Sequence, residues 1–246
     1  MMASARNDPR KSGTIWAVNL DENKPALQPR IPVVFRHAGP ETLEPLVAAM
    51  GEGLRPEILR RFEAGKRCYA AWAGERIAAY GWVSRDDEYI GEFNLRVRLL
   101  LGEAYIWDCL TVPAYRRQGI YSALLIHILK ELQQDGLCRA WIGADMDNVA
   151  SQRGIARAGF HFVADMVLAR VLAMRMVWVQ GRPGVPEGAV AEARRAFLDN
   201  RDTVWLKGMA LSRNSAQEAF QPQAPLAGIT GNANPSSDST LAGDKP

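Results

Sequence analysis

The chain has 246 residues, 48% of them hydrophobic, which is enough to bury a sizeable core in one large domain or two small ones. Its 30 Lys and Arg residues nearly balance 27 Asp and Glu residues and are scattered, so we expect no nucleic-acid partner. The three cysteines lie far apart and have no zinc-ligand spacing, so we expect no metal. Because neither an apolar targeting segment nor a run of 18 apolar residues occurs, we expect a cytoplasmic protein without a membrane partner.

Composition divides the chain into four parts. Residues 1–30 lack a sustained hydrophobic period and predict a loose arm, although residues 14–20 could form a short strand. Residues 31–180 predict a folded domain. Residues 181–211 predict a C-terminal extension with room for one helix. Residues 212–246 are rich in Ser, Pro, Ala, Asn, Gly and Gln, which predicts a disordered tail.

The first half of the domain predicts a strand, two helices and a β-hairpin. The second helix carries Pro56 in its first turn, where the missing N–H costs no hydrogen bond. Two apolar runs flank Gly74 and Glu75, which take the position of a two-residue hairpin turn. In chain order, the predicted elements are a strand at 33–36, helices at 41–50 and 56–64, and strands at 67–73 and 76–84.

The second half of the domain predicts strands that alternate with helices. Residues 92–99 alternate polar and apolar, which predicts a strand with one solvent-exposed face that extends the sheet. Residues 104–112 are mostly apolar, as is typical of a central strand buried on both faces. Residues 119–134 carry an apolar stripe at helical spacing. The order strand, helix, strand, helix, strand predicts a crossover unit. The remaining elements are a strand at 139–144, a helix at 148–158 and one or two strands within 160–179.

The turn between the central strand and the next helix is the clearest candidate site. Arg116, Arg117 and Gln118 precede Gly119 at the start of the predicted helix. A helix N-terminus offers unpaired N–H groups and the positive end of the helix dipole, so this turn predicts an anion site that would fit a pyrophosphate. The alternative is a surface turn with solvated arginines.

Residues 111–120 resemble the strand-to-helix signature of the GNAT acyltransferases. The family pattern is Gln or Arg, two residues, Gly, one residue, and Gly or Ala. Arg116 and Gly119 match this pattern, whereas Tyr121 lies where Gly or Ala is usual.

A second motif at the right distance strengthens the resemblance. Asn148 and the segment 157–160 are similar to the family's later helix, which runs from Asn to Gly-Phe. The resemblance covers about residues 33–172, and we therefore identify residues 31–180 as a GNAT-like acyltransferase domain.

The resemblance implies an α+β (mixed α/β) fold. Its central sheet is mixed but mostly antiparallel, with helices on both faces and splayed fourth and fifth strands. In such proteins the pantetheine arm of acetyl-CoA, the co-substrate, lies between those two strands and pairs with the fourth. The implied cofactor-binding residues are Cys109, Leu110, Thr111, Arg116, Arg117, Gln118, Gly119, Ile120, Tyr121, Ser122, Asn148 and Ser151.

The implied activity is acyl-CoA-dependent N-acetyltransfer. The acetyl group would pass to a primary amine on a small molecule or a peptide, by direct attack through a tetrahedral intermediate. Two alternatives remain open: a non-catalytic acyl-CoA-binding module, or the same fold with a longer acyl or aminoacyl donor. Neither the acceptor nor the oligomeric state follows from the sequence.

The groups that move protons depart from the family pattern. Positions where relatives often carry a Glu, Asp or His base hold Tyr105 and Trp107 here. Asp108 is the nearest carboxylate and our candidate base, with a structural pair to an Arg as the alternative. Glu92 and Glu103 are further candidates.

The position of the family's general acid, a Tyr on the later helix, holds Ile155 here. Tyr121 is our candidate to protonate the leaving thiolate. The alternatives are Tyr115, water, or departure of the thiolate without a proton donor. We expect structural roles for the three histidines. Trp82 and Trp107 could line an acceptor pocket.

Overall fold

The computed structural model describes residues 10–90, 95–171, 174–198, 203–206 and 209–212. The predicted disordered tail, apart from its first residue, lies outside the described residues, as does Glu92.

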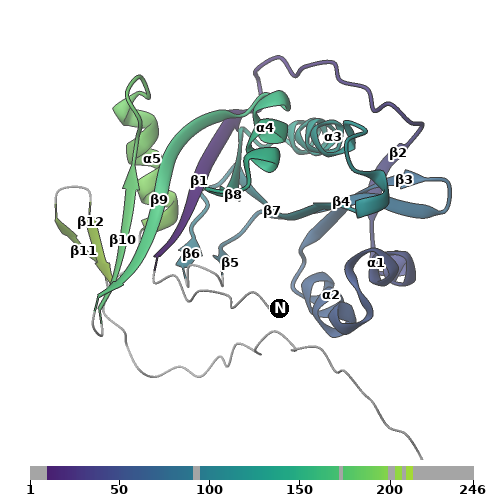
Figure 1. The fold of residues 1–246 in the computed structure, drawn as a ribbon, viewed down its shortest axis with the longest axis horizontal. Helices are drawn as coiled ribbons and strands as arrows, with labels where there is room; N and C mark the ends of the chain where they lie inside the picture. The colour runs from purple at the N-terminus through teal and green to yellow at the C-terminus, as the bar shows by residue number, and fades with distance from the viewer. Residues whose placement is uncertain (1–9, 91–94, 172–173, 199–202, 207–208, 213–246) are drawn as a thin grey trace, which may run out of the picture. The chain divides into compact units, whose positions relative to one another are not determined.

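A ten-stranded sheet forms the centre of the described part of the chain (Figure 1). Its strands are β1 (Arg10–Asn19), β2 (Val34–Ala38), β3 (Arg67–Ala73), β4 (Arg76–Ser84), β7 (Glu103–Thr111), β8 (Arg139–Asp145), β9 (His161–Val171), β10 (Met174–Gln180), β11 (Thr203–Leu206) and β12 (Met209–Ser212). They lie in the order β11-β12-β10-β9-β1-β8-β7-β4-β3-β2. Neighbouring strands are antiparallel except β7 and β8, which are parallel. The predicted mixed, mostly antiparallel sheet is confirmed.

Helices cover both faces of this sheet (Figure 1). Ile106 and Ile142 face α3 (Ile120–Gln134) and α4 (Val149–Arg157). Tyr105 and Trp141, their neighbours in sequence, point to the opposite face and contact Phe197 of α5 (Glu187–Leu198). The helices α1 (Leu43–Met50) and α2 (Arg55–Glu63) lie on that same opposite face. The predicted α+β arrangement is therefore confirmed.

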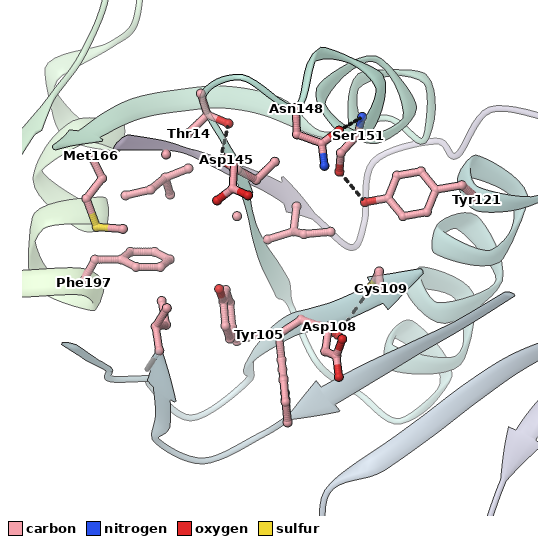
Figure 2. A pocket seen from close by; sticks show the side chains of 17 residues that line it. Thr14, Tyr105, Asp108, Cys109, Tyr121, Asp145, Asn148, Ser151, Met166 and Phe197 are labelled. Atoms are coloured by element: carbon pink, nitrogen blue, oxygen red, sulfur yellow. Dashed lines mark hydrogen bonds between the residues drawn. The ribbon is translucent and has the colours of Figure 1, made fainter. Parts of the chain in front are cut away.

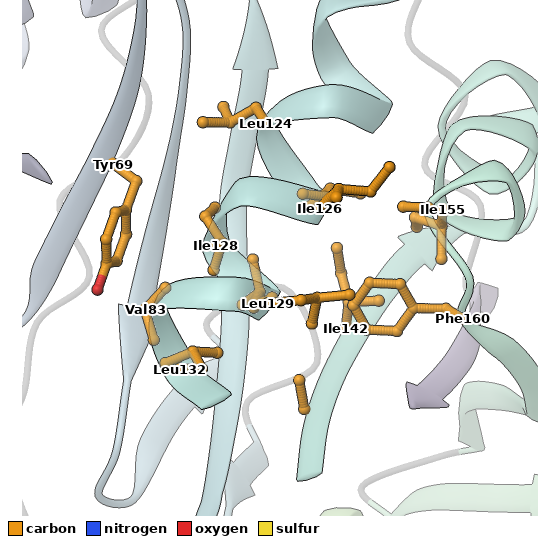
Figure 3. Close-up of a cluster of buried hydrophobic side chains, with 14 of the residues drawn as sticks. Tyr69, Val83, Leu124, Ile126, Ile128, Leu129, Leu132, Ile142, Ile155 and Phe160 are labelled. Carbon is orange, nitrogen blue, oxygen red and sulfur yellow. The ribbon is translucent and has the colours of Figure 1, made fainter. Parts of the chain in front are cut away.

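The apolar stripe of α3 forms the centre of the main core (Figure 3). Leu124, Ile128, Leu129 and Leu132 are fully buried. They pack against strands on one side and near Ile155 of α4 on the other. Truncating one such leucine to alanine typically costs about 2–5 kcal/mol of stability, so this packing holds the start of α3 firmly in place.

The parallel pair β7 and β8 separates part-way along its length. The two strands pair only from Glu103 opposite Arg139 to Ile106 opposite Ile142. Beyond that point β7 continues to Thr111 and β8 continues to Asp145. Counted within residues 31–180, these are the fourth and fifth strands of the main sheet, so the predicted splay is present.

The prediction of a loose arm for residues 1–30 is wrong for residues 10–19. These residues form β1, which lies inside the sheet between β8 and β9. Ile15 and Val18 of this strand are buried. The apolar pattern of this strand is short, and the strands that pair with it follow more than 100 residues later. Local sequence patterns therefore could not predict its place in the sheet.

The predicted strand at 92–99 does not extend the main sheet. Its described part is β6 (Leu95–Val97), which pairs with β5 (Glu88–Ile90) in a separate small sheet. Leu95 and Val97 are buried against the core that contains α5. Their alternating pattern therefore reflects contact with this helix, which lies far along the chain.

The extension at 181–211 contains α5 followed by β11 and β12. No helix within the described residues is both long enough and apolar enough to cross a lipid bilayer.

Candidate functional site

The N-terminus of α3 opens onto a hollow of about 730 Å³, called here the phosphate hollow. Gly119 is the N-cap residue with a φ of 77°, and Arg117 has a φ of 64°, so the turn passes twice through the left-handed region. No described side chain caps the helix, so its first N–H groups remain for a ligand. Every predicted cofactor-binding residue except Gln118 lines this hollow.

Gln118 lies outside the phosphate hollow but fixes the turn beside it. Its carbonyl oxygen accepts a hydrogen bond of 2.8 Å from the backbone N–H of Arg30. The segment that follows β1 is thereby attached to the turn.

Four arginines surround the phosphate hollow. Arg116 and Arg117 come from the turn, and Arg153 and Arg157 come from α4. The second pair was missed in the sequence, where its signal is a spacing of four residues on one helix face. Arginine suits the recognition of phosphate groups, so the charge in this hollow favours a polyanionic ligand.

A β-bulge lies in β7 just beyond the point where this strand leaves β8. Trp82 of β4 pairs with Trp107 and Tyr80 pairs with Leu110, so one residue of β4 faces two of β7. Asp108 is at this bulge and has a φ of 43°. A bulge bends its strand, which accounts for the gap between β7 and β8.

A second hollow of about 280 Å³, called here the acceptor hollow, adjoins the first (Figure 2). The two hollows share four lining residues, which are Cys109, Tyr121, Asn148 and Ser151. From there the acceptor hollow extends toward β1, β9 and α5. A long ligand held at the phosphate hollow can therefore reach the acceptor hollow.

Tyr121 lies where the hollows meet, with its hydroxyl group 3.0 Å from Oγ of Ser151 (Figure 2). Its ring lies against Gly154 of α4, where an added Cβ would come 2.4 Å from Cδ1 of the ring. Burial raises the pKa of Tyr121, partly offset by the bond to Ser151. The phenol therefore remains protonated at neutral pH.

Asn148 caps α4 at the same junction. Its Oδ1 accepts the N–H of Ser151 at 3.0 Å, which fixes the side-chain amide. As predicted, this residue begins a helix, and the structure adds that it lines both hollows.

Asp108 lines the acceptor hollow, but its carboxylate is bound by an arginine. Nη1 of Arg61, on α2, lies 2.5 Å from Oδ2 of Asp108. The same guanidinium also binds Glu57 and lies over the rings of Trp107 and Trp82, at 4.5 and 5.1 Å from their centroids. The structural pair that we considered as an alternative is thus present.

Residues 39–160 match the family model described as the acetyltransferase (GNAT) family. The chain belongs to the GNAT family. The match contains the turn at α3, the bulge of β7 and the cap of α4, and it leaves β1, β9, β10 and α5 outside.

Several known proteins are similar to this GNAT chain. The [ribosomal protein bS18]-alanine N-acetyltransferase of Escherichia coli is 31% identical over 64 residues, which are 26% of this chain and 43% of the relative. The match thus spans less than half of this curated relative.

Two solved acetyltransferase structures are also similar. The acetyltransferase of Colwellia psychrerythraea is 19% identical, with a TM-score of 0.46, over 70% of this chain and 56% of that one. The aminoglycoside 6'-N-acetyltransferase AAC(6')-Ih of Acinetobacter baumannii is 18% identical, with a TM-score of 0.41, over 53% and 91% respectively.

The remaining candidates of this GNAT domain have other partners or lie elsewhere. Glu103 is buried and bound by Arg195 at 2.7 and 2.8 Å, so it does not reach the acceptor hollow. Ile155 is fully buried in the core. Trp107 lines the acceptor hollow as expected, whereas Trp82 is buried beneath Arg61.

The histidines lie outside both hollows. His127 stacks on Phe35 at 5.5 Å between centroids, and burial lowers its pKa. His161 pairs with Glu22 at 2.8 Å, and His37 packs edge-on against a tyrosine ring.

Most residues on the far side of the acceptor hollow were missed in the sequence. Residues of β1, β8, β9 and α5 line this side, and no local motif connects these elements to the turn at α3. They include Thr14, Ile15, Asp145, Met166 and Phe197.

Proposed function

We propose that this GNAT-family protein is an acetyl-CoA-dependent N-acetyltransferase that transfers the acetyl group to a primary amine. The observation that carries the proposal is the junction of the two hollows where β7 and β8 separate, beside the uncapped N-terminus of α3. The E. coli relative is named as an N-acetyltransferase for an alanine of a ribosomal protein, which supports an amine acceptor.

The phosphate hollow suits the diphosphate of CoA. Backbone N–H groups at Gly119 and after it would bind the phosphate oxygens, and the four arginines would balance their charge. Gly119 allows the turn its left-handed conformation and leaves space for a close approach.

The free edge of β7 suits the pantetheine arm. The N–H of Val112 donates to the carbonyl of Ala78 on β4 at 2.9 Å. Because backbone N–H groups alternate in direction along a strand, the N–H of Leu110 also points to β4. The N–H groups of Cys109 and Thr111 then face the gap, where they can bind the arm and the oxyanion of the tetrahedral intermediate. Oγ1 of Thr111 is buried and has no hydrogen-bond partner among the described residues, which supports a ligand here.

Tyr121 is suited to act as the general acid. The amine nitrogen would attack the thioester carbon, and collapse of the intermediate would break the C–S bond. The protonated phenol of Tyr121 would then donate its proton to the leaving thiolate. Tyr121 reaches the junction from α3, whereas the family's usual acid comes from the helix that carries Ile155 here.

Asp108 is the proposed general base for the amine. Its carboxylate lines the acceptor hollow, and Arg61 holds it. It would therefore accept the proton of the amine through a water molecule or after the ion pair opens.

The test uses the full chain with acetyl-CoA and a panel of primary amines. Calorimetry would measure the binding of acetyl-CoA, and a thiol reagent would measure the release of CoA. Amine-dependent release supports the proposal. Saturable binding without release for any amine would instead indicate the acyl-CoA-binding module, which the buried Ile155 favours.

A further inference from the structure

The far wall of the acceptor hollow is apolar and buried. Ile15, Met166 and Phe197 are 1%, 4% and 1% exposed, and all three line the hollow. They come from β1, β9 and α5, which lie outside the segment that matches the family model. In Figure 2, Met166 and Phe197 lie on the opposite side of the hollow from Tyr121 and Ser151.

One carboxylate faces the space between this wall and the junction. Asp145, at the end of β8, points there in Figure 2 and lines the hollow. Within the described residues, no cation or hydrogen-bond donor is found on its carboxylate. Asp108 differs, because Arg61 already neutralises it. A cationic ligand would therefore find its free partner at Asp145.

The size of the hollow limits what can enter it. At about 280 Å³, it lies just below the roughly 300–1,000 Å³ that is typical of ligand sites. It suits a short amine-bearing group better than a large polar ring system.

We infer that the acceptor is a primary amine on a short apolar group. Its ammonium binds Asp145, and its apolar group packs against Ile15, Met166 and Phe197. This inference rests on the proposed acetyl transfer and names its substrate class. The ammonium passes one proton to Asp108, the proposed base, directly or through a water molecule, and the neutral amine then attacks the thioester at the junction.

A longer acyl chain of the donor is the competing occupant of the wall. An acyl chain carries no charge, so it could pack against the wall but would make no ionic contact with Asp145, which is exposed and therefore hydrated when it has no partner. A cationic amine with an apolar group satisfies both the carboxylate and the wall. The structure therefore favours the acceptor as the occupant.

The experiment compares matched amines with acetyl-CoA as the donor. Butylamine and 3-amino-1-propanol have the same number of heavy atoms but differ in polarity at the far end. We expect kcat/KM for butylamine to be higher by about tenfold, since one buried hydroxyl without a partner costs on the order of 1–3 kcal/mol. Equal values, or a preference for the amino alcohol, would overturn the inference while leaving the proposed acetyl transfer intact.

Asp145→Asn tests the ammonium site. Because Asp145 is exposed, we expect the loss of this ion pair to raise KM for butylamine by a few-fold, about 1 kcal/mol or less, while the Kd of acetyl-CoA stays unchanged. Asp147→Asn is the matched control, because Asp147 is exposed and lines neither hollow. An unchanged KM in Asp145→Asn would contradict the role of Asp145.

Phe197→Leu tests the wall, with a thermal melt to confirm that the variant folds. We expect the preferred amine to lengthen from butylamine toward hexylamine. If butanoyl-CoA and hexanoyl-CoA instead outpace acetyl-CoA, and Phe197→Leu shifts that preference, the wall serves the donor and the inference is wrong. Failure of every amine to release CoA would overturn both the inference and the proposed function, and Asp145→Asn decides the inference if Phe197→Leu does not fold.

Discussion

The two hollows are built in different ways. The phosphate hollow is formed by residues within 109–122 of one strand, turn and helix, together with residues along α4 from its cap at Asn148 to its last residue, Arg157. The acceptor hollow is lined by residues of β1, β5, β7, β8, β9 and α5. These lining residues range in sequence from Gly13 to Phe197. The comparison shows that the proposed cofactor end depends on a local turn, whereas the acceptor end depends on the assembly of the whole sheet.

The largest effect is expected at the turn of the phosphate hollow. Gly119→Asp places a negative charge at the anion site and a side chain at a φ of 77°. We expect the affinity for CoA to fall by at least about 100-fold, from charge repulsion and backbone strain together. Calorimetry measures the affinity, and Arg117→Glu should act in the same direction.

Arg76→Glu is the matched control for charge reversal, because Arg76 is exposed on the hairpin and lines neither hollow. Unchanged CoA affinity in both turn variants would show that the cofactor does not bind at this turn.

The junction of the hollows should give the next largest effect. Tyr121→Phe removes the proposed acid, so we expect kcat to fall by about 100-fold, the low end for general acid catalysis. The Kd of acetyl-CoA should not change. A kcat equal to that of the wild type would remove Tyr121 as the acid and leave Tyr115 or water as the proton donor.

The pH profile sharpens this test. Burial raises the pKa of Tyr121, and an acid is active below its pKa. We therefore expect no loss of wild-type kcat from Tyr121 on the alkaline side up to about pH 10, the ordinary value for a phenol. A fall in kcat near pH 8 that disappears in Tyr121→Phe would contradict the assignment.

Gly154→Ala tests the contact that positions Tyr121. The new Cβ would lie 2.4 Å from the tyrosine ring, so the ring must move. We expect kcat to fall about tenfold, because small displacements of a catalytic group reduce the rate strongly. Gly188→Ala on α5 is the matched control, since nothing lies within 4 Å of its added Cβ.

The smallest effect is expected for Asp108→Asn. Arg61 keeps Glu57 as a partner, and the Asp108 side chain is 34% exposed, so we expect stability to fall by about 1 kcal/mol or less. Denaturant unfolding measures this change. A several-fold lower kcat under conditions in which the variant remains folded would support Asp108 as the base, and full activity would remove it from the mechanism.

Much of the fold and of the phosphate hollow could be predicted because the signals are local. The stripe of α3, the cap at Asn148 and the hairpin turn at Gly74 each depend on residues a few positions apart, and the structure confirms all three elements. Arg116 and Gly119 lie at one turn for the same reason.

The acceptor hollow could not be predicted in the same way. Ile15, Asp145 and Phe197 meet only because β1 enters the sheet beside β8 and α5 covers that face. Nothing near each residue in sequence identifies its partners. The sequence identified Asp108 as a carboxylate near the site. Its ion pair with Arg61 could not be predicted, because the two residues are 47 positions apart and the bulge at Asp108 changes the direction of its side chain.

The location of β1 also has a consequence for synthesis of the chain. This strand leaves the ribosome before residues 39–160, yet its two neighbours in the sheet, β8 and β9, are made more than 100 residues later. Until they emerge, β1 has no edge to join, and without β1 the edge of β8 is open to pairing with other chains. We therefore expect that removing residues 10–19 causes aggregation during expression, even though the family segment is intact.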